Sequence, residues 1–238
     1  MNEERLYRMI EEKEGIVSLA FPALMRKVYV WMTLALVITG FTAFGVASSP
    51  GLVYTIVTNQ MLFWGLIIAE FALVMGISWG IRRLSITTAT LLFILYSVVN
   101  GATLSVIFMA YTLSSIASVF FITAGTFGVM AFIGYTTKKD LTSLGKLLFM
   151  GLIGLILATI VNMFIGSSML NLIASYVGVG IFIGLTAYDS QKIKNMLYDA
   201  DDMDEGAQKI ALLGALTLYL DFINLFLYLL RIFGSDKD

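Results

Sequence analysis

The sequence contains no cysteine and no histidine, and only 2 of its 238 residues are proline. Without cysteine the chain cannot form disulfides, thiolate nucleophiles or iron–sulfur clusters. Without histidine it lacks the commonest metal ligand and the side chain that usually changes charge near neutral pH. Any sensing of protons must therefore use carboxylates, and we expect no resident cofactor.

Charged residues are also scarce, at 13% of the chain against 59% hydrophobic residues. An ordinary soluble domain has roughly 45–50% apolar and about 25% charged residues. A soluble fold of this size could not bury so much apolar surface, so the composition predicts an all-α integral membrane protein with the lipid bilayer as its surroundings. The net charge of −1 provides no attraction to nucleic acid.

Apolar segments long enough to cross a bilayer, which takes roughly 20 residues, recur along the chain. Seven segments qualify: Val28–Ala47, Met61–Gly80, Ile86–Tyr111, Ile116–Tyr135, Leu147–Gly166, Leu170–Tyr188 and Ile210–Leu230. We therefore expect an N-terminal polar segment at 1–25, a seven-helix transmembrane domain at 26–233 and a short tail at 234–238. The last span is the weakest of the seven, and a re-entrant last helix is the alternative.

The basic residues predict the orientation of these spans. If the N-terminus is cytoplasmic, all of the 15 Lys and Arg residues except Arg231 and Lys237 fall on the cytoplasmic side. This asymmetry obeys the positive-inside rule and also supports the number of spans. The N-terminal segment is rich in glutamate and does not resemble a cleaved signal peptide. We expect a multi-pass protein of the bacterial plasma (inner) membrane with a cytoplasmic N-terminus.

Small residues recur at a spacing that lets helices pack closely. Gly76/Gly80 and Gly180/Gly184 are GxxxG pairs, which in a membrane favour close helix–helix contact. They predict a tight bundle and identify no ligand.

Three acids stand out because ionisable groups inside a bilayer usually face a cavity or a partner. Asp221 lies near the middle of the last span, with Asn224 three residues later on the same face. Asp189 closes the sixth span, and Glu70 lies deep in the second. The structural alternatives are an interfacial acid for Asp189 and a simple ion pair for Glu70.

Basic partners for these acids are present in the sequence. Arg82 and Arg83 follow the second span at the same predicted depth as Asp189. Arg231 follows the last span on the other side and could bend inward toward Glu70, because long basic side chains can reach along the membrane normal. The sequence thus offers two possible ionic closures, one near each face.

Three stretches resemble the Bax inhibitor-1 family of small membrane proteins. They are the last helix from Gly214 to Arg231, the sequence Tyr188-Asp-Ser-Gln-Lys-Ile193 and the Lys138-Lys-Asp-Leu141 loop. The resemblance implies seven helices with the last at the centre of the other six. It also implies a pH-dependent calcium leak in which Asp189 and Asp221 sense protons.

The same resemblance implies roles for the basic residues. An arginine after the second helix, Arg82 or Arg83 here, would act as a latch on the aspartate pair, and Glu70 and Arg231 would pair toward the outer face. Two carboxylates in one site of low dielectric cannot both ionise cheaply, so such a pair titrates as a unit. Calcium prefers six to eight oxygen ligands. Asp189, Asp221 and Asn224 therefore offer only weak calcium binding, which suits conduction.

The depths of the two aspartates are difficult to reconcile from the sequence. Asp221 lies eleven residues after Ile210, which is about 16 Å along a straight helix, whereas Asp189 is expected near the interface. The two carboxyl groups can meet only if the last helix starts late, if it tilts, or if water reaches inward from the cytoplasm.

Three other functions fit parts of this pattern. An intramembrane aspartyl protease also uses two aspartates, but its Gly-x-Gly-Asp sequence is absent around Asp221 and its later Pro-Ala-Leu is missing, so we do not expect an enzyme. A non-conducting regulator could bind a membrane protease or a stress-response partner. A transporter that couples protons or cations to a second solute is the third alternative.

Overall fold

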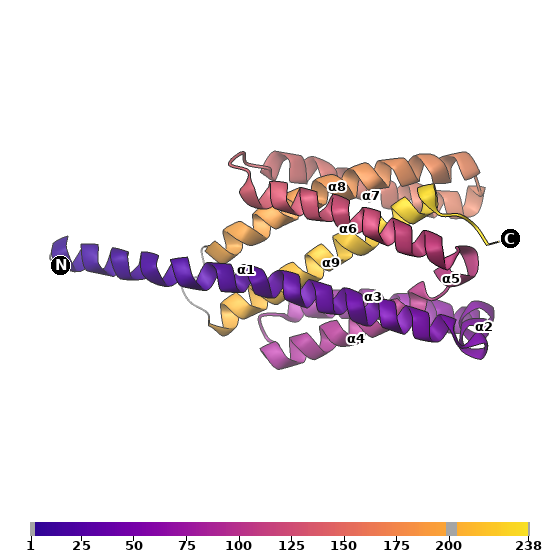
Figure 1. Ribbon diagram of the computed structural model, residues 1–238, viewed down its shortest axis with the longest axis horizontal. Helices are drawn as coiled ribbons and strands as arrows, with labels where there is room; N and C mark the ends of the chain where they lie inside the picture. Colours follow the sequence, from indigo (N-terminus) through magenta and orange to yellow (C-terminus); the bar gives the residue numbers. More distant parts are fainter. Residues whose placement is uncertain (1–2, 199–203, 238) are drawn as a thin grey trace.

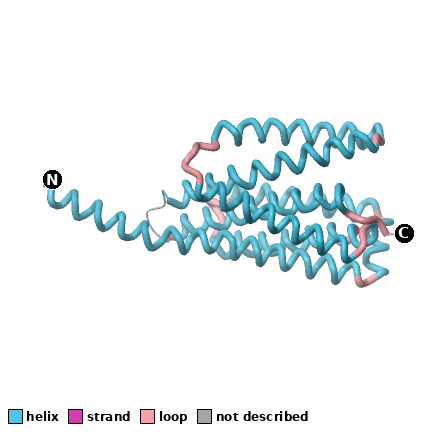
Figure 2. The backbone as a smooth tube through the Cα atoms, turned by 45° about the horizontal axis from the view of Figure 1, so that its top comes forward, coloured by secondary structure: helices cyan, strands magenta, loops and turns pink. Residues whose placement is uncertain are grey.

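The computed structural model describes residues 3–198 and 204–237, with side chains described from residue 21 onward. Over these residues the chain consists of helices joined by short connections (Figures 1 and 2). The helices are α1 (Glu3–Ala47), α2 (Pro50–Thr58), α3 (Gln60–Gly80), α4 (Ile86–Leu104), α5 (Ile107–Ala110), α6 (Leu113–Thr136), α7 (Thr142–Ile165), α8 (Ser168–Tyr198) and α9 (Glu205–Phe233).

The predicted all-α fold with seven spans is confirmed. The helical segments long and apolar enough to cross a membrane are Phe21–Ala47, Gln60–Gly80, Ile86–Ala110, Leu113–Thr136, Thr142–Ile165, Ser168–Tyr198 and Glu205–Phe233. The last span is a continuous helix of 29 residues, so it is long enough to cross at the usual rise of about 1.5 Å per residue. At the sixth span, α8 continues ten residues beyond the expected end at Tyr188.

Local sequence signals fix several helix ends. Asn59, Ser85, Thr112 and Asp204 each cap a helix, accepting a hydrogen bond from a backbone N–H of its first turn. Such side chains satisfy backbone donors that have no partner within the helix. At the other end of a helix, Gly166 closes α7 with a φ of 68°, a conformation that glycine adopts without steric penalty.

The last helix forms the centre of the bundle, as the family resemblance implies. Helix α9 runs obliquely between the other helices (Figure 1) and packs against α1, α4, α6 and α8. In its most apolar 18-residue window 67% of the residues are buried, against 6% in α3 and in α7. Helix α9 therefore links α1 and α4 to α6 and α8.

Helices α3 and α7 occupy outer positions in the bundle. Helix α3 packs mainly on α4, and α7 packs mainly on α8. Both present many large apolar side chains outward, including Phe71, Trp79, Phe149 and Phe164. Such surfaces suit contact with lipid tails, which do not penalise exposed apolar groups.

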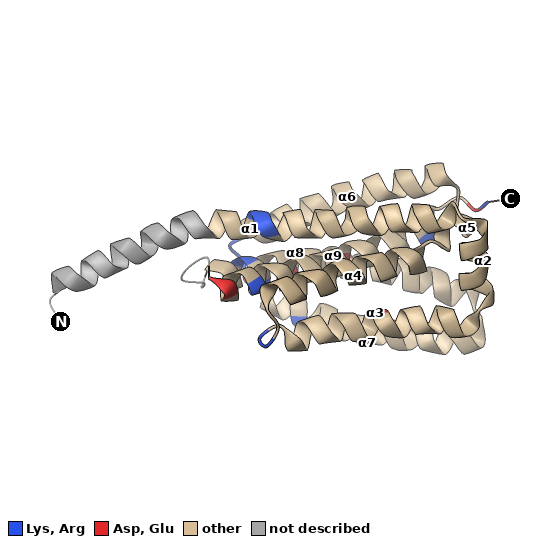
Figure 3. Cartoon of the chain, turned by 90° about the horizontal axis from the view of Figure 1, so that it is seen from below, with Lys and Arg blue, Asp and Glu red and all other residues tan. Residues whose placement is uncertain are grey.

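The described basic side chains gather at one end of the bundle (Figure 3). We call this the basic end, and its residues are Arg26, Lys27, Arg82, Arg83, Lys138, Lys139, Lys146, Lys192, Lys194 and Lys209. Arg231, in the last turn of α9, and Lys237, in the tail that follows it, lie at the opposite end. There the C-terminal tail returns to the α5–α6 corner, where the Lys237 N–H donates to the Ala110 carbonyl at 2.9 Å.

Candidate functional site

The structure brings Asp189 of α8 and Asp221 of α9 together in the core of the bundle. Their carboxyl groups are within hydrogen-bonding reach of each other. Only 9% of the surface of Asp189 and 5% of that of Asp221 is exposed. The two acidic side chains therefore meet in the interior of the bundle, largely shielded from the surroundings.

The two aspartates meet because α8 is longer than expected and α9 is oblique to it. Helix α8 remains helical to Tyr198, so Asp189 lies well inside the helix rather than at its end. Helix α9 begins early, at Glu205, and is not broken at Gly214. A Cβ atom at Gly214 would lie 2.9 Å from the Ile193 side chain. The two helices therefore approach closely on the basic-end side of the pair.

One oxygen of the pair has no partner. The Oδ2 atom of Asp221 is buried and makes no hydrogen bond to any described residue. An unsatisfied buried polar atom is destabilising by about 1–3 kcal/mol. Groups of this kind are retained mainly at functional sites.

A large cavity reaches this pair. It has a volume of about 870 Å³ and is lined by residues of α3, α4, α7, α8 and α9, a size typical of ligand-binding pockets. Asp189 and Asp221 line it, as do Glu70 and Asn224. The cavity therefore connects the aspartate pair with Glu70, the third acid singled out from the sequence.

Glu70 belongs to a hydrogen-bonded chain that crosses the bundle. Asn100 Nδ2 donates to Glu70 Oε2 at 3.2 Å, and the Tyr219 hydroxyl donates to Asn100 Oδ1 at 2.9 Å. Thr39 Oγ1 lies 2.6 Å from the Tyr219 hydroxyl and 3.0 Å from the carbonyl of Ser97, and because the Tyr219 proton points to Asn100, the Thr39 hydroxyl can donate its one proton to either of these acceptors. The chain thus links α1, α9, α4 and α3. The other oxygen of Glu70, Oε1, is buried without a partner among the described residues.

The arginines expected to latch the pair lie away from it in this structure. Arg82 and Arg83 are exposed in the turn between α3 and α4. The Arg83 backbone N–H donates to the Gly80 carbonyl at 2.8 Å, but neither arginine side chain forms an ion pair or hydrogen bond with the residues that the structure describes. A latch between Arg82 or Arg83 and the aspartates stays a prediction.

Arg231 and Asn224 have local partners. The Arg231 guanidinium lies 5.3 Å from the centre of the Tyr228 ring, a cation–π distance, and over the described residues it forms no ion pair with Glu70. Asn224 Nδ2 donates to the Leu220 carbonyl at 2.8 Å within α9. The expected Glu70–Arg231 closure likewise stays a prediction, whereas Asn224 does face the cavity.

The described side chains offer few ligands for a metal ion. Over the described residues no three or more acidic, histidine or cysteine side chains lie close enough together to hold one metal ion. Calcium binds tightly only with six to eight oxygen ligands. The aspartate pair therefore suits at most a weak, passing contact with a divalent cation.

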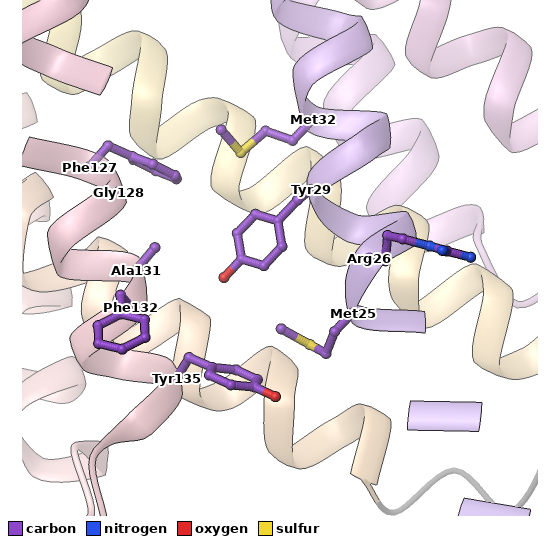
Figure 4. A pocket seen from close by; sticks show the side chains of 9 residues that line it. All are labelled: Met25, Arg26, Tyr29, Met32, Phe127, Gly128, Ala131, Phe132 and Tyr135. Atoms are coloured by element: carbon purple, nitrogen blue, oxygen red, sulfur yellow. The ribbon is translucent and has the colours of Figure 1, made fainter. Parts of the chain in front are cut away.

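A second, smaller cavity of about 380 Å³ lies between α1 and α6 (Figure 4). Its walls are aromatic and methionine side chains, and the Tyr29 side chain projects into it from α1. Arg26, the charged residue on its border, turns away from the space in this view. The cavity contains no carboxylate, so it is not part of the acidic site.

The polar partners of Glu70 were not predicted from the sequence. Asn100 and Tyr219 are buried inside spans, where an amide and a hydroxyl need partners. Two residues in the sequence could have indicated these partners: Asn100 is a lone amide in an apolar segment, and Tyr219 lies two residues before Asp221. Which helix each would face depends on tertiary packing, which periodicity alone does not reveal.

Comparison with known proteins places the chain in a family. The family model described as "Inhibitor of apoptosis-promoting Bax1" matches residues 22–238. The inner membrane protein YbhL of Escherichia coli strain K12 is 52% identical over 214 residues, covering 90% of this chain and 92% of YbhL. An uncharacterized protein of Borreliella burgdorferi is 46% identical, over 96% of this chain and 97% of its own length. An uncharacterized protein of Rickettsia prowazekii is 43% identical, over 90% of both chains. None of these names refers to a catalytic activity. The chain belongs to the Bax inhibitor-1 family, as the residues of its last helix indicated.

Proposed function

We propose that this protein is a calcium leak channel whose opening depends on protonation of the Asp189–Asp221 pair. The observation that carries the proposal is the contact between these two buried carboxyl groups at the wall of a cavity of about 870 Å³. Protons and calcium are then the ligands of the site, and no cofactor takes part.

The chemistry of the pair supports a proton-dependent switch. Two carboxylates that share a site of low dielectric bind and release a proton as a unit. With one proton present, the carboxyl groups can hydrogen-bond and hold α8 against α9. When that proton leaves, the two negative charges repel each other, and this repulsion favours separation of α8 from α9. The chain has no histidine, so carboxylates must supply this response.

The proposed topology places the basic end in the cytoplasm of a bacterial cell, with the protein in the plasma membrane. The positive-inside rule supports this orientation, and the similarity to an inner membrane protein of E. coli supports the location. Arg82 or Arg83 would then approach Asp189 from the cytoplasmic side when the latch forms, and Glu70 and Arg231 would close the opposite side.

Reconstitution in liposomes tests the proposal. Purified protein would be placed in liposomes loaded with a calcium dye, and calcium entry followed from about pH 5 to pH 8, where a perturbed carboxylate pair can titrate. We expect the wild-type flux to depend on pH and Asp189→Asn and Asp221→Asn to lose that dependence. Asp140→Asn, in the exposed α6–α7 loop, is the matched control and should keep the wild-type profile.

Two outcomes would contradict the leak proposal. One is a folded wild-type protein that passes no calcium at any pH. The other is an unchanged pH profile in both aspartate variants, which would show that the pair is not the sensor.

The alternative is a membrane regulator that binds another protein without conducting ions. The family description, which names an inhibitor, favours this second function. A membrane protease is the partner class we expect. Cross-linking in native membranes followed by purification would test it, with stoichiometric capture of one partner and no flux from the purified protein as the expected result.

A further inference from the structure

The large cavity opens to the side of the bundle rather than only to its ends. Three of its lining residues are large apolar side chains that are themselves well exposed: Phe71 of α3 at 68%, and Phe149 and Ile156 of α7 at 59% and 51%. Helices α3 and α7 each pack mainly on a different neighbour. The mouth of the cavity between them therefore faces the surface that lipid tails would cover.

The walls of the cavity combine acidic and aromatic groups. Three carboxyl groups line it, from Glu70, Asp189 and Asp221, and both Glu70 and Asp221 carry a buried oxygen with no partner among the described residues. Aromatic rings on its walls come from Phe71, Tyr96, Phe149, Phe182, Tyr188 and Tyr228. Aromatic faces attract cations, most strongly when both are away from water.

This combination fits an organic cation better than a bare metal ion. A metal ion that leaves water needs a full set of oxygen ligands, six to eight for calcium, and the cavity walls are mostly carbon. A hydrophobic ammonium or phosphonium ion is weakly hydrated, so apolar and aromatic walls can surround it while a carboxylate balances its charge.

We propose that the cavity binds a hydrophobic monovalent organic cation that enters from the bilayer between α3 and α7. Glu70 and Asp221 supply the balancing charge, and the aromatic walls surround the apolar groups of the ligand. Lys146 and Lys192 also line the cavity but are exposed at the basic end, so an anionic amphiphile is the competing occupant. The proposal does not depend on the calcium leak.

A pair of probes with the same shape and opposite charge distinguishes the two occupants. Tetraphenylphosphonium and tetraphenylborate would be titrated into purified protein in detergent without calcium, with protein-free micelles subtracted. We expect saturable binding of one phosphonium ion per chain and at least about tenfold weaker binding of the borate, as expected for loss of one charge-assisted contact. Equal binding of both ions, tighter binding of the borate, or no saturable phosphonium binding would overturn the proposal.

Variants locate the bound cation. Glu70→Gln and Asp221→Asn should each raise the Kd for tetraphenylphosphonium about tenfold or more. Glu205→Gln, an exposed acid at the start of α9 that does not line the cavity, should leave it unchanged. Wild-type affinity in both cavity variants would also overturn the proposal. If either variant fails to fold, the comparison of the two probes on wild-type protein still decides.

Discussion

Tyr219 connects three other helices to the central helix through a single hydroxyl group. That hydroxyl lies 2.6 Å from Thr39 Oγ1 and 2.9 Å from Asn100 Oδ1, and no part of the residue is exposed. Tyr219→Phe would leave the Asn100 oxygen without a partner in the core. We expect a loss of about 1–3 kcal/mol in the free energy of unfolding, measured as a lower apparent melting temperature in detergent.

Tyr96→Phe provides the matched control for this change. The Tyr96 ring packs edge-on against Tyr219 and is equally buried, but over the described residues its hydroxyl makes no hydrogen bond of the kind seen for Tyr219. Its removal should therefore be less destabilising. If the two variants lose equal stability, the ring packing rather than the hydrogen-bonded chain accounts for the effect of Tyr219.

The carboxylate of Asp140, in the loop between α6 and α7, should make the stability of the fold depend on pH in acid. Hydrogen bonds from the side chain and backbone N–H of Thr142 hold the pKa of Asp140 below its ordinary value of 3.8. A carboxylate with a lowered pKa stabilises the fold above its unfolded-state pKa, and that contribution disappears as the pH falls through the folded-state pKa. Thermal unfolding should show Asp140→Asn slightly less stable than wild type at neutral pH.

The difference between Asp140→Asn and wild type should shrink as the buffer is acidified below the ordinary pKa of 3.8. A constant difference at every pH would mean that the substitution acts through the shape of the loop rather than through the charge of the carboxylate. Thr142→Val removes the hydroxyl but keeps the backbone N–H, so at neutral pH it should lose only part of the stability that Asp140→Asn loses.

At the scale of single residues, the sequence predicted the acids, and the family resemblance implied the aspartate pair, but neither predicted the partners of Glu70. Asp189, Asp221 and Glu70 were recognisable because charge is rare inside a span. The partners of Glu70 were not, because the hydrogen-bonded chain through Asn100, Tyr219 and Thr39 depends on how four helices are rotated about their axes. The sequence of an apolar span says little about how the helix is rotated about its axis, because apolar side chains can face either the lipid or the protein core.

At the scale of helices, the span predictions followed hydrophobicity, whereas the helices follow packing as well. Helix α8 continues past Tyr188 because Ile193 and Leu197, four residues apart, are buried against the bundle. That spacing places them on one face of a helix. A search for apolar runs ends where polar residues begin, even though the amphipathic helix continues.

The glycine pairs illustrate the same limit. Added Cβ atoms at Gly76 and Gly180 would meet nothing within 4 Å, whereas one at Gly184 would lie 2.6 Å from the Leu148 side chain of α7, so only one of the two GxxxG pairs includes a close contact between helices. A tight crossing also occurs outside these pairs, at Gly134 of α6, where a Cβ would collide with the carbonyl oxygen of Ala187 in α8. Spacing identified small residues but not the face that each helix uses.

Gly134→Ala should therefore separate α6 from α8. The added methyl group meets backbone rather than a flexible side chain, and overpacking of this kind is destabilising by about 1–3 kcal/mol. Because Ala187 is two residues before Asp189, we also expect calcium flux to change in its pH dependence. Gly128→Ala, on the same helix with open space around its Cβ, should be neutral in both measurements. Wild-type stability in Gly134→Ala would show that the helices can shift at no cost.

At the scale of the whole molecule, charge and hydrophobicity predicted the number of spans, and the family resemblance implied the central place of α9. Neither predicted that α3 and α7 would stand apart with a cavity between them. That arrangement follows from which helices cover α9, namely α1, α4, α6 and α8. The outer helices close the acidic cavity only in part, so access from the side is a property of the assembled bundle.

The absence of cysteine makes the orientation of the bundle directly measurable. Single cysteines can be introduced at Lys138, in the α6–α7 loop of the basic end, and at Ser49, in the α1–α2 connection at the opposite end. Both positions are well exposed or lie in connections, so the substitutions should not disturb packing. If the basic end faces the cytoplasm, as the positive-inside rule predicts, a membrane-impermeant maleimide added to spheroplasts should label Ser49→Cys and leave Lys138→Cys unlabelled until the membrane is permeabilised. The reverse pattern would place the basic end outside, and the latch arginines would then have to act from the external face. Labelling of both positions in intact spheroplasts would contradict an odd number of complete spans between them.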